Sequence, residues 1–452
     1  MFFFRNKPSA DASPFWFVGL HISSRARKLE AALIGVANSR PGAEVTLPKS
    51  VSFDLPDELS QLYAGLREEA FYDEATIFRN ASRGSESATN GVKRSRGQGR
   101  TDEISAFARF LELRAMIALI EEEAVEELLR DTKVAIGDLV LVAVNEPTLA
   151  ARAPERSTRS TRASIGSAAA LAERLGVPVL DSLRLNAGDE LPGGDPNLLL
   201  AYWTLLSSGE RDKLLVDFGE RARWCYIPSA ANDPTSWKRA RFEEVAPCGA
   251  LLDPLALEVS KGETPIDVGG KLSVQGQRIA ELLDFWRAQS ALVAPSAVNR
   301  RLSATGSALN ERFYLETLQR FGQKISSLDA LCTAANLIAE STVDSIKARE
   351  TEFASSYDLI VAGAAKRNGL IMSRVGALMS PKAPHRLEEY GLLEDSFDGV
   401  AVALMGAFYA SGVCAAVPEY FGGEKPALLG RLNCGGDVWK NLSTFRNRST
   451  KS

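Results

Sequence analysis

The sequence predicts an α/β protein with two lobes, mixed sheets flanked by helices and a central cleft, and three observations support this. The chain has 452 residues, about two to three times the length of a usual domain. Hydrophobic residues make up 45% of it and charged residues 24%, a balance typical of globular proteins with substantial cores. Short apolar runs that end in Gly or Ala alternate with helical patterns in both halves, as in sheets flanked by helices.

The first half alternates predicted strands and helices. The clearest helix covers 101–130, where Phe110, Leu113 and Ile117 recur at three- and four-residue steps and a run of glutamates leaves a polar face. Before it, residues 82–100 are rich in Ser, Gly and Arg and predict a flexible surface loop. The other predicted elements of this half are strands at 15–20, 30–36, 134–144 and 177–180 and helices at 56–78 and 166–175.

The second half repeats the pattern. Residues 214–218 form a predicted strand that ends at Gly219, and residues 357–362 form another that ends at Gly363. Small residues after a strand let backbone N–H groups approach a phosphate, although close packing of strand on helix explains such a turn about as well. Predicted helices cover 274–286, 327–348 and the residues from the Gly363 turn to 378.

One segment is long enough to cross a membrane, because Gly399–Pro418 has 20 residues and no charge. Its Ala, Gly, Val and Ser content makes insertion weak, and acidic rather than basic residues precede it. We therefore expect a buried helix of a large core, and no membrane partner. The amino-terminal residues 1–7 also lack the apolar region of a signal peptide, which predicts a cytoplasmic protein.

Charge and residue counts argue against several functional classes. A net charge of −4 gives no reason to expect nucleic-acid binding, which depends on Lys and Arg that neutralise phosphates. The five cysteines are scattered and contain no CxxC pair, which indicates reduced thiols rather than a zinc or redox motif. With only two histidines, a His-based triad or a His-rich metal site is not expected.

Three stretches near the carboxyl terminus carry a more specific signal. Residues 358–379 read DLIVAGAAKRNGLIMSRVGALM, residues 395–405 read DSFDGVAVALM, and residues 426–430 read PALLG. In this order they resemble the adenine-side turn, a following helix and the closing strand of the anhydro-N-acetylmuramic acid kinases. That family is part of the actin-like sugar-kinase superfamily, and the resemblance runs with gaps from about Val18 to Gly436.

The resemblance implies two actin-like (ribonuclease-H-like) lobes, at 15–205 and 206–436, followed by a tail at 437–452. It also implies ATP-dependent phosphorylation of an anhydro amino sugar in cell-wall recycling, with Mg²⁺ beside the nucleotide, and it leaves homodimer formation open. The positions that match the family's site are Ser23, Ser24, Gly219, Gly363, Ala364 and Asn368 for the cofactor, Thr148 and Arg184 for the substrate, Asp181 and Ser182 for catalysis, and Glu244 for the metal.

Several polar positions depart from the family's pattern. In the first phosphate loop, two long cations at 27–28 replace an Asp-Gly pair, and in the second-lobe loop Glu220 replaces a glycine. Strict spacing places Ser182 at the catalytic aspartate, and the preceding Asp181 faces the other side of a strand. Three hypotheses follow: an active sugar kinase that uses Asp181 or Glu244, a pseudokinase that acts as a binding or scaffolding module, or new chemistry in the same cleft.

Overall fold

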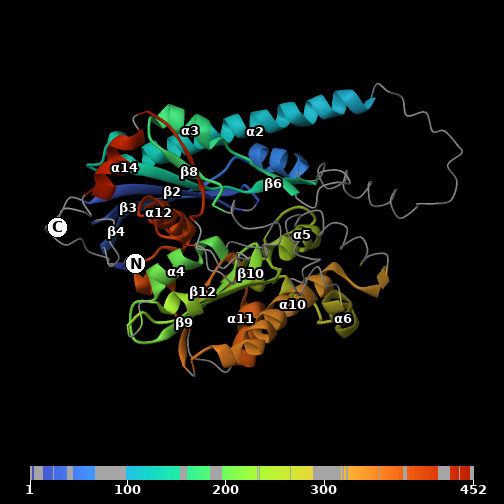
Figure 1. Cartoon of the computed structure of the whole chain (residues 1–452). Coiled ribbons are helices and arrows are strands. Elements are labelled where there is room, and N and C mark those ends of the chain that lie inside the picture. Colours follow the sequence, from blue (N-terminus) through green and yellow to red (C-terminus); the bar gives the residue numbers. More distant parts are fainter. Residues whose placement is uncertain are drawn as a thin grey trace, which may run out of the picture.

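The structure is a computed structural model, and it describes most of the chain (Figure 1). The described residues are 3–4, 14–66 except 24 and 38–43, 98–152, 160–183, 196–288 except 232, 234 and 265, 317, 320–321, 324–379 except 355, 384–415, and 428–447 except 437.

The first sheet has seven strands in the order β1-β4-β3-β2-β5-β8-β13. Strands β2, β3 and β4 form an antiparallel meander, β5 lies parallel beside β2, β8 lies parallel beside β5, and β13 closes the edge antiparallel to β8. The strands are β1 (Phe3–Phe4), β2 (Phe15–Ile22), β3 (Lys28–Val36), β4 (Glu44–Asp54), β5 (Leu139–Asn145), β8 (Val179–Asp181) and β13 (Arg431–Asn433).

The second sheet repeats this topology with four strands in the order β11-β10-β9-β12. Strands β9, β10 and β11 again form an antiparallel meander, and β12 lies parallel beside β9. The shared arrangement confirms the predicted α/β fold with two mixed sheets. These strands are β9 (Asp212–Phe218), β10 (Arg221–Ile227), β11 (Arg241–Pro247) and β12 (Tyr357–Ala362), and a separate hairpin pairs β6 (Thr148–Arg152) with β7 (Ser160–Ser164).

Helices pack in three layers around the two sheets (Figure 1). Helices α2 and α3 cover the outer face of the first sheet, α4 and α12 lie between the sheets, and α5, α6, α10 and α11 cover the outer face of the second sheet. The helices are α2 (Gln98–Leu129), α3 (Ala168–Leu175), α4 (Leu199–Leu206), α5 (Gly249–Val259), α6 (Ala280–Ala288), α10 (Ser327–Ala348), α11 (Gly369–Met379), α12 (Phe397–Ala410) and α14 (Val438–Asn447).

Helix α12 is the centre of the middle layer, and nearly all of its side chains are buried. Gly19 of β2 lies directly beneath it, where a Cβ atom would overlap the backbone of Gly399 and Ala403. Residues 399–410 of the uncharged segment therefore form the buried helix that the sequence predicts, but the helix ends at Ala410, and residues 416–418 lie outside the described ones. Among the described residues, no helix is long and apolar enough to cross a membrane.

The carboxyl-terminal elements return to the first lobe. Strand β13 pairs with β8, and the ring of Phe445 in α14 packs edge-on against Phe15 and Phe17 of β2. The segment 206–436, expected as the second lobe, thus also supplies α12 and β13 to the first lobe. Part of the expected tail at 437–452 is a packed helix, because a fully buried aromatic ring anchors it.

Other predicted bounds also differ from the structure; the strand predicted at 134–144, for example, begins only at Leu139, after a 3₁₀ turn at 136–138. Helix α2 begins at Gln98, inside the predicted loop 82–100, whose other residues lie outside the described ones. The helix predicted at 56–78 is described only from Asp57 to Leu66. The helix predicted at 274–286 is shorter, because the backbone forms a 3₁₀ turn at 273–275 before α6 begins.

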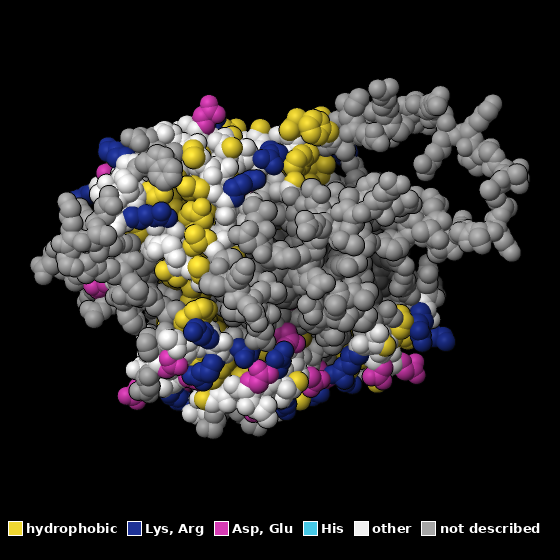
Figure 2. All heavy atoms as spheres, viewed as in Figure 1, with side chains coloured by type: hydrophobic (Ala, Val, Ile, Leu, Met, Phe, Trp, Pro, Cys, Tyr) yellow, Lys and Arg dark blue, Asp and Glu magenta, His cyan; other side chains and the backbone are white. Residues whose placement is uncertain are grey.

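The surface of one face is shown in Figure 2. Basic and acidic side chains are interspersed over the lower lobe, and hydrophobic side chains gather over α2 at the top of the view. The exposed large hydrophobic residues of α2 are Phe107, Leu111 and Leu119.

Candidate functional site

Asp398, in the first turn of α12, is the centre of a polar network between the lobes. Its Oδ1 accepts a hydrogen bond from the Tyr202 hydroxyl of α4 at 2.6 Å. Its Oδ2 accepts a hydrogen bond from Arg223 of β10 at 3.1 Å and lies 3.6 Å from Nε2 of His21, near the end of β2. Arg223 also donates to Asp217 of β9 at 2.6 Å. The network therefore joins both sheets to the helices of the middle layer.

Burial and neighbouring charge shift the pKa values of two carboxyl groups of this region in opposite directions. Burial would raise the pKa of Asp398, but the charges of Arg223 and His21 outweigh it, and the pKa lies below its usual range. Glu30 of β3 accepts the backbone N–H of Asp398 at 3.0 Å. Burial and the charge of Asp398 raise the pKa of Glu30 to about 8. At neutral pH Asp398 is therefore ionised and Glu30 is mostly protonated.

Ion pairs join the β2–β3 turn of the first lobe to the β9–β10 turn and α5 of the second. Arg25 donates to Oδ2 of Asp253 in α5 at 2.8 Å, and its Nε lies 3.4 Å from Oε1 of Glu220. Arg27 lies 3.7 Å from the same oxygen of Asp253. The side chains of Arg25, Glu220 and Asp253 are only 18–19% exposed, so water shields these charges poorly. The two turns that resemble phosphate loops therefore bind each other.

Ser23 shapes the first of these turns. Its hydroxyl oxygen accepts the backbone N–H of Arg27 at 3.2 Å and that of Lys28 at 3.1 Å. Lys28 in turn donates to Asp395 at 2.7 Å. Ser23 acts only as an acceptor in these bonds, so its hydroxyl proton can still be donated to a ligand. Ser24, the other serine predicted to contact the cofactor, lies outside the described residues.

Gly219 and Gly363 lie beside each other where β9 and β12 end. A Cβ atom on Gly363 would overlap Asp217 and the backbone nitrogen of Gly219, and its φ of 87° also favours glycine. The N–H of Gly363 donates to Oε1 of Glu394 at 2.6 Å, and Ala364 opens the 3₁₀ turn that follows. The structure thus brings three predicted cofactor residues to one edge of the second sheet, where a carboxylate accepts one of their N–H groups.

Asn368, the sixth predicted cofactor residue, is buried at the start of α11. Its Oδ1 accepts the backbone N–H groups of Leu370 at 3.0 Å and Ile371 at 3.3 Å, which caps the helix. Its side-chain amide donates to Oδ2 of Asp267 at 3.3 Å. Asn368 therefore also holds the segment after α5 against the start of α11.

Asp181 ends β8 and is held by an ion pair across the edge of the first sheet. Arg431 of β13 donates from Nε to Oδ1 at 3.1 Å and from its terminal nitrogen to Oδ2 at 2.6 Å. The next residue, Ser182, has a φ of 54°, in the left-handed region. Thr148 begins the β6–β7 hairpin, and Arg184 lies outside the described residues. Both oxygens of the candidate catalytic carboxylate are thus engaged with a guanidinium group.

Glu244, the candidate metal ligand, lies in β11 and is almost fully buried. It forms an ion pair with Arg221 of the neighbouring strand β10. In the part of the chain that the structure describes, no group of three or more His, Cys, Asp or Glu residues is placed to hold a metal ion. A role of Glu244 in metal binding stays a prediction.

Two buried carboxyl groups near Asp181 were not expected from the sequence. Burial and the neighbouring Glu146 raise the pKa of Glu121 in α2 well above its usual range, and burial also raises the pKa of Glu146. Glu146 accepts the backbone N–H of Gly166 at 2.7 Å, but its other oxygen and both oxygens of Glu121 have no described donor. A proton shared between the two carboxyl groups supplies the missing bond. The spacing in the sequence could have indicated the burial of Glu121, because Glu121 follows the buried Ile117 by four residues and so lies on the same face of the helix.

The family model for anhydro-N-acetylmuramic acid kinase matches residues 97–434. The anhydro-N-acetylmuramic acid kinase from Cyanothece sp. is 26% identical to this chain, over 60% of this chain and 70% of its own length. The anhydro-N-acetylmuramic acid kinase from Gloeobacter violaceus is 24% identical, over 71% of this chain and 81% of its own length. The solved activator of 2-hydroxyisocaproyl-CoA dehydratase from Clostridium difficile is 11% identical, covers 88% of this chain and 96% of its own, and has a TM-score of 0.36, too low to support an argument. Because the family model matches well over half of its residues, the chain belongs to the anhydro-N-acetylmuramic acid kinase family.

Proposed function

We propose that this protein is a divergent anhydro-N-acetylmuramic acid kinase-like protein whose interlobe site acts as a binding module and has lost most or all phosphotransfer. The observation that carries the proposal is the pairing of Arg25 with Glu220 and Asp253 between the two turns that resemble phosphate loops. A triphosphate between these turns would have to break the ion pairs and lie beside two carboxylates.

Electrostatics oppose a nucleotide in this position. Two like charges 4 Å apart repel by about 4 kcal/mol at an effective dielectric constant near 20. If Arg25 turned toward a phosphate group, Glu220 and Asp253 would each lose an ion pair while both are largely buried. We therefore infer that nucleotide affinity is lower here than it would be with glycine at position 220.

The candidate base is also engaged. Arg431 bonds both oxygens of Asp181, so it occupies two of the about four acceptor sites of this carboxylate and competes with an attacking water for them. Ser182, at the aligned position, has a hydroxyl that cannot take a proton at neutral pH without a neighbouring base. Loss of a general base typically lowers the rate by a factor of ~10²–10⁴. This supports a site that binds without efficient phosphotransfer.

A second candidate is retained ATP-dependent phosphorylation of an anhydro amino sugar, favoured by the preserved turn at Gly363 and Asn368. The side chain of Arg431 is 60% exposed, so a local movement would release Asp181 to act as the base. ATP would then contact the predicted cofactor residues Ser23, Ser24, Gly219, Gly363, Ala364 and Asn368. Mg²⁺ would lie beside Glu244, and the sugar would lie beside Thr148 and Arg184. Mg²⁺ would supply charge neutralisation at the phosphates.

Calorimetry with Mg²⁺-ATP, followed by a phosphotransfer assay with anhydro-N-acetylmuramic acid, tests the proposal. Millimolar or weaker binding without sugar phosphate is the expected result. Micromolar ATP binding with turnover would overturn it in favour of the second candidate. Asp181→Asn is the matched control for any turnover, because an amide cannot accept the proton and only a contaminating kinase would survive the change.

We extend the proposal to location and assembly. All five cysteines are free thiols, three of them buried, which suits a reducing compartment such as the cytoplasm. Homodimer formation is a separate proposal that rests on the family resemblance alone. Light scattering of the purified chain measures it directly.

A further inference from the structure

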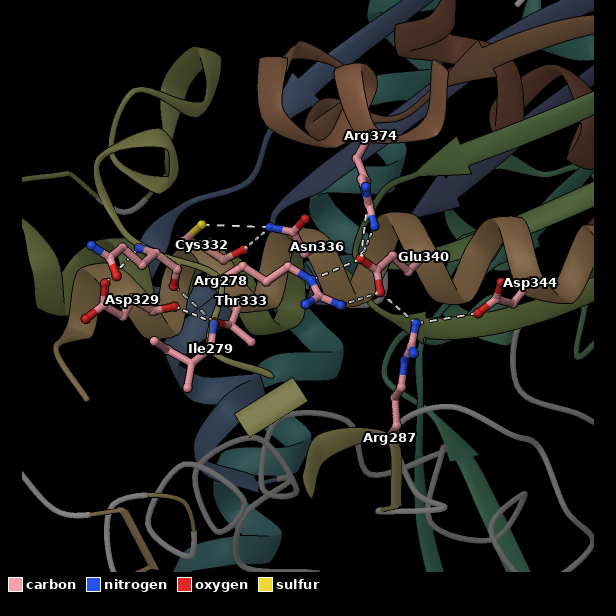
Figure 3. Close-up of polar contacts among 11 residues, drawn as sticks. Arg278, Ile279, Arg287, Asp329, Cys332, Thr333, Asn336, Glu340, Asp344 and Arg374 are labelled. Atoms are coloured by element: carbon pink, nitrogen blue, oxygen red, sulfur yellow. Dashed lines mark hydrogen bonds and ion pairs between the residues drawn. The ribbon is translucent and has the colours of Figure 1, made fainter. Parts of the chain in front are cut away.

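Three arginines converge on one carboxylate in the outer helix layer of the second lobe (Figure 3). The carboxylate is that of Glu340, in α10. Arg278, just before α6, bonds its two oxygens at 3.1 and 3.2 Å. Arg374 of α11 bonds Oε1 at 2.8 and 3.1 Å, and Arg287 in the last turn of α6 bonds Oε2 at 2.7 Å. Side chains from three separate segments therefore meet at one point.

The backbone that carries Arg278 is held in place on both sides of it. The N–H of Gln277 donates to Asp329 at 2.7 Å, and the N–H of Ile279 donates to Thr333 at 3.0 Å. Both acceptors lie on α10, about two and three turns before Glu340 (Figure 3). The guanidinium group is thus positioned before any ligand arrives, which lowers the entropy cost of binding.

The cluster has more donors than its carboxylates use. A carboxylate offers about four acceptor sites, and Arg278 and Arg374 already make four hydrogen bonds to Glu340. Arg287 adds a fifth and also lies 3.5 Å from Asp344. If the cluster served only as a brace, that is, a set of ion pairs that holds the helices together, two guanidinium groups would be enough. Its presence leaves three positive charges beside two negative ones.

Exposure shows that the surplus donors are open to solvent. The three arginine side chains are 36–39% exposed, whereas the Glu340 side chain is 6% exposed. Burial would raise the pKa of Glu340, but hydrogen bonds from Arg278 and Arg374 outweigh it and the pKa lies below its usual range. Glu340 is therefore a fixed negative charge beneath a patch of arginines that repel one another unless an anion joins them.

We propose that Arg278, Arg287 and Arg374 form a binding site for a phosphate monoester, which competes for their donors with the carboxylate of Glu340 beneath them. Planar guanidinium groups bind phosphate oxygens in pairs, and the negative charge of the phosphate offsets the surplus positive charge. The phosphate is carried by a small metabolite or by a phosphoserine peptide. The site lies on the outer helices and does not depend on activity between the lobes.

The test uses the full chain with inorganic phosphate at constant ionic strength, followed by calorimetry and thermal unfolding. Phosphate is expected to bind and to raise the Tm. Arg287→Gln should weaken binding about tenfold, since a charged hydrogen bond is lost. Arg349→Gln, just past the end of α10, is the matched control and should bind like the native chain. No phosphate binding, or equal binding by Arg287→Gln, would overturn the proposal.

Glu340→Gln separates a binding site from a brace. Removal of the competing carboxylate should tighten phosphate binding, although it lowers the Tm without phosphate. If this variant binds more weakly in step with its lower Tm, the arginines are a brace and the proposal is wrong. A hexose 6-phosphate and a phosphoserine peptide are then compared, and the tighter of the two identifies which source of phosphate the site accepts.

Discussion

Arg25 and Asp253 are 228 positions apart in the chain and 2.8 Å apart in the fold. Arg25 also lies 3.4 Å from Glu220, so one base on the first turn faces two acids on the other side. All three side chains are largely buried, and removing the partner of a buried charge is destabilising. We infer that these ion pairs hold the lobes together.

A double-mutant cycle measures this contact. Arg25→Ala and Asp253→Ala should each lower the free energy of unfolding by about 1–3 kcal/mol, since each removes the hydrogen-bonded partner of a largely buried charge. The double variant should lose at least about 0.5 kcal/mol less than the sum. Urea denaturation provides the three values. Arg27→Ala, whose side chain is 53% exposed, is the control and should change little. Additive losses would show that the two residues do not interact.

Glu220→Gln should tighten Mg²⁺-ATP binding, because it removes a like charge from the turn that resembles a phosphate loop. About tenfold is expected, equivalent to roughly 1.4 kcal/mol. Calorimetry measures it at fixed ionic strength, since screening weakens the effect. Glu263→Gln removes an exposed charge from the same lobe and should leave affinity unchanged. If both variants tightened Mg²⁺-ATP binding equally, the cause would be the net charge of the protein rather than the charge of Glu220 at the site.

Glu30 should make the protein less stable as pH rises. Its pKa is raised from 4.5 to about 8 by burial and by Asp398, so the folded state holds a proton that the unfolded state releases. The stabilisation is fully present below about pH 4.5 and is lost as pH rises through about 8. Lys28 and the cross-strand His21 are the other charged or titratable neighbours.

Glu30→Gln removes this titration. Thermal unfolding between about pH 5 and pH 9 should therefore show a smaller decrease in Tm for this variant than for the native chain. Glu58→Gln, an exposed residue that follows β4, should keep the native profile. If Glu30→Gln leaves the profile unchanged, Glu30 does not hold the proton.

Glu121→Gln tests the shared proton in the first lobe. The amide can donate to Glu146 without taking up a proton, so the variant should gain stability at pH 8 relative to the native chain and gain less at pH 5. The sign follows from the raised pKa of Glu121, which makes the native pair lose stability as pH rises. Glu123→Gln, exposed on the same helix, should show no such pH-dependent gain. A loss of stability at both pH values would contradict the shared proton.

Local patterns predicted the elements of the fold well where one signal dominates. The bounds of α10 match the predicted 327–348, and β12 matches the predicted 357–362. Continuous apolar runs and helical spacing are properties of neighbouring residues, so they can be seen without knowing the fold. The return of β13 to the first sheet could not be seen in this way, because it depends on pairing across 250 positions, as between Asp181 and Arg431.

The candidate site was predictable only in part, for the same reason. The resemblance pointed to Gly219 and Gly363, and the structure brings them together. The network of Asp398, Arg223 and His21 joins three distant segments, and of these residues only Asp398 lies in one of the stretches, 395–405, that carry the resemblance. Charge compensation between the two turns is also a property of the folded chain alone.

Gly19→Ala tests how closely α12 packs on β2. A methyl group at this position would overlap the backbone of Gly399 and Ala403, and neither backbone can move without separating a buried helix from the sheet. Overpacking of a tight core costs about 1–3 kcal/mol, and contact with backbone rather than side chain places this case at the upper end. Gly376→Ala in α11 is the control, because nothing lies within 4 Å of the added methyl group and alanine favours a helix. Urea denaturation should therefore show a large loss for the first variant and a small gain for the second. Equal stability of Gly19→Ala and the native chain would show that the helix does not lie this close to the strand.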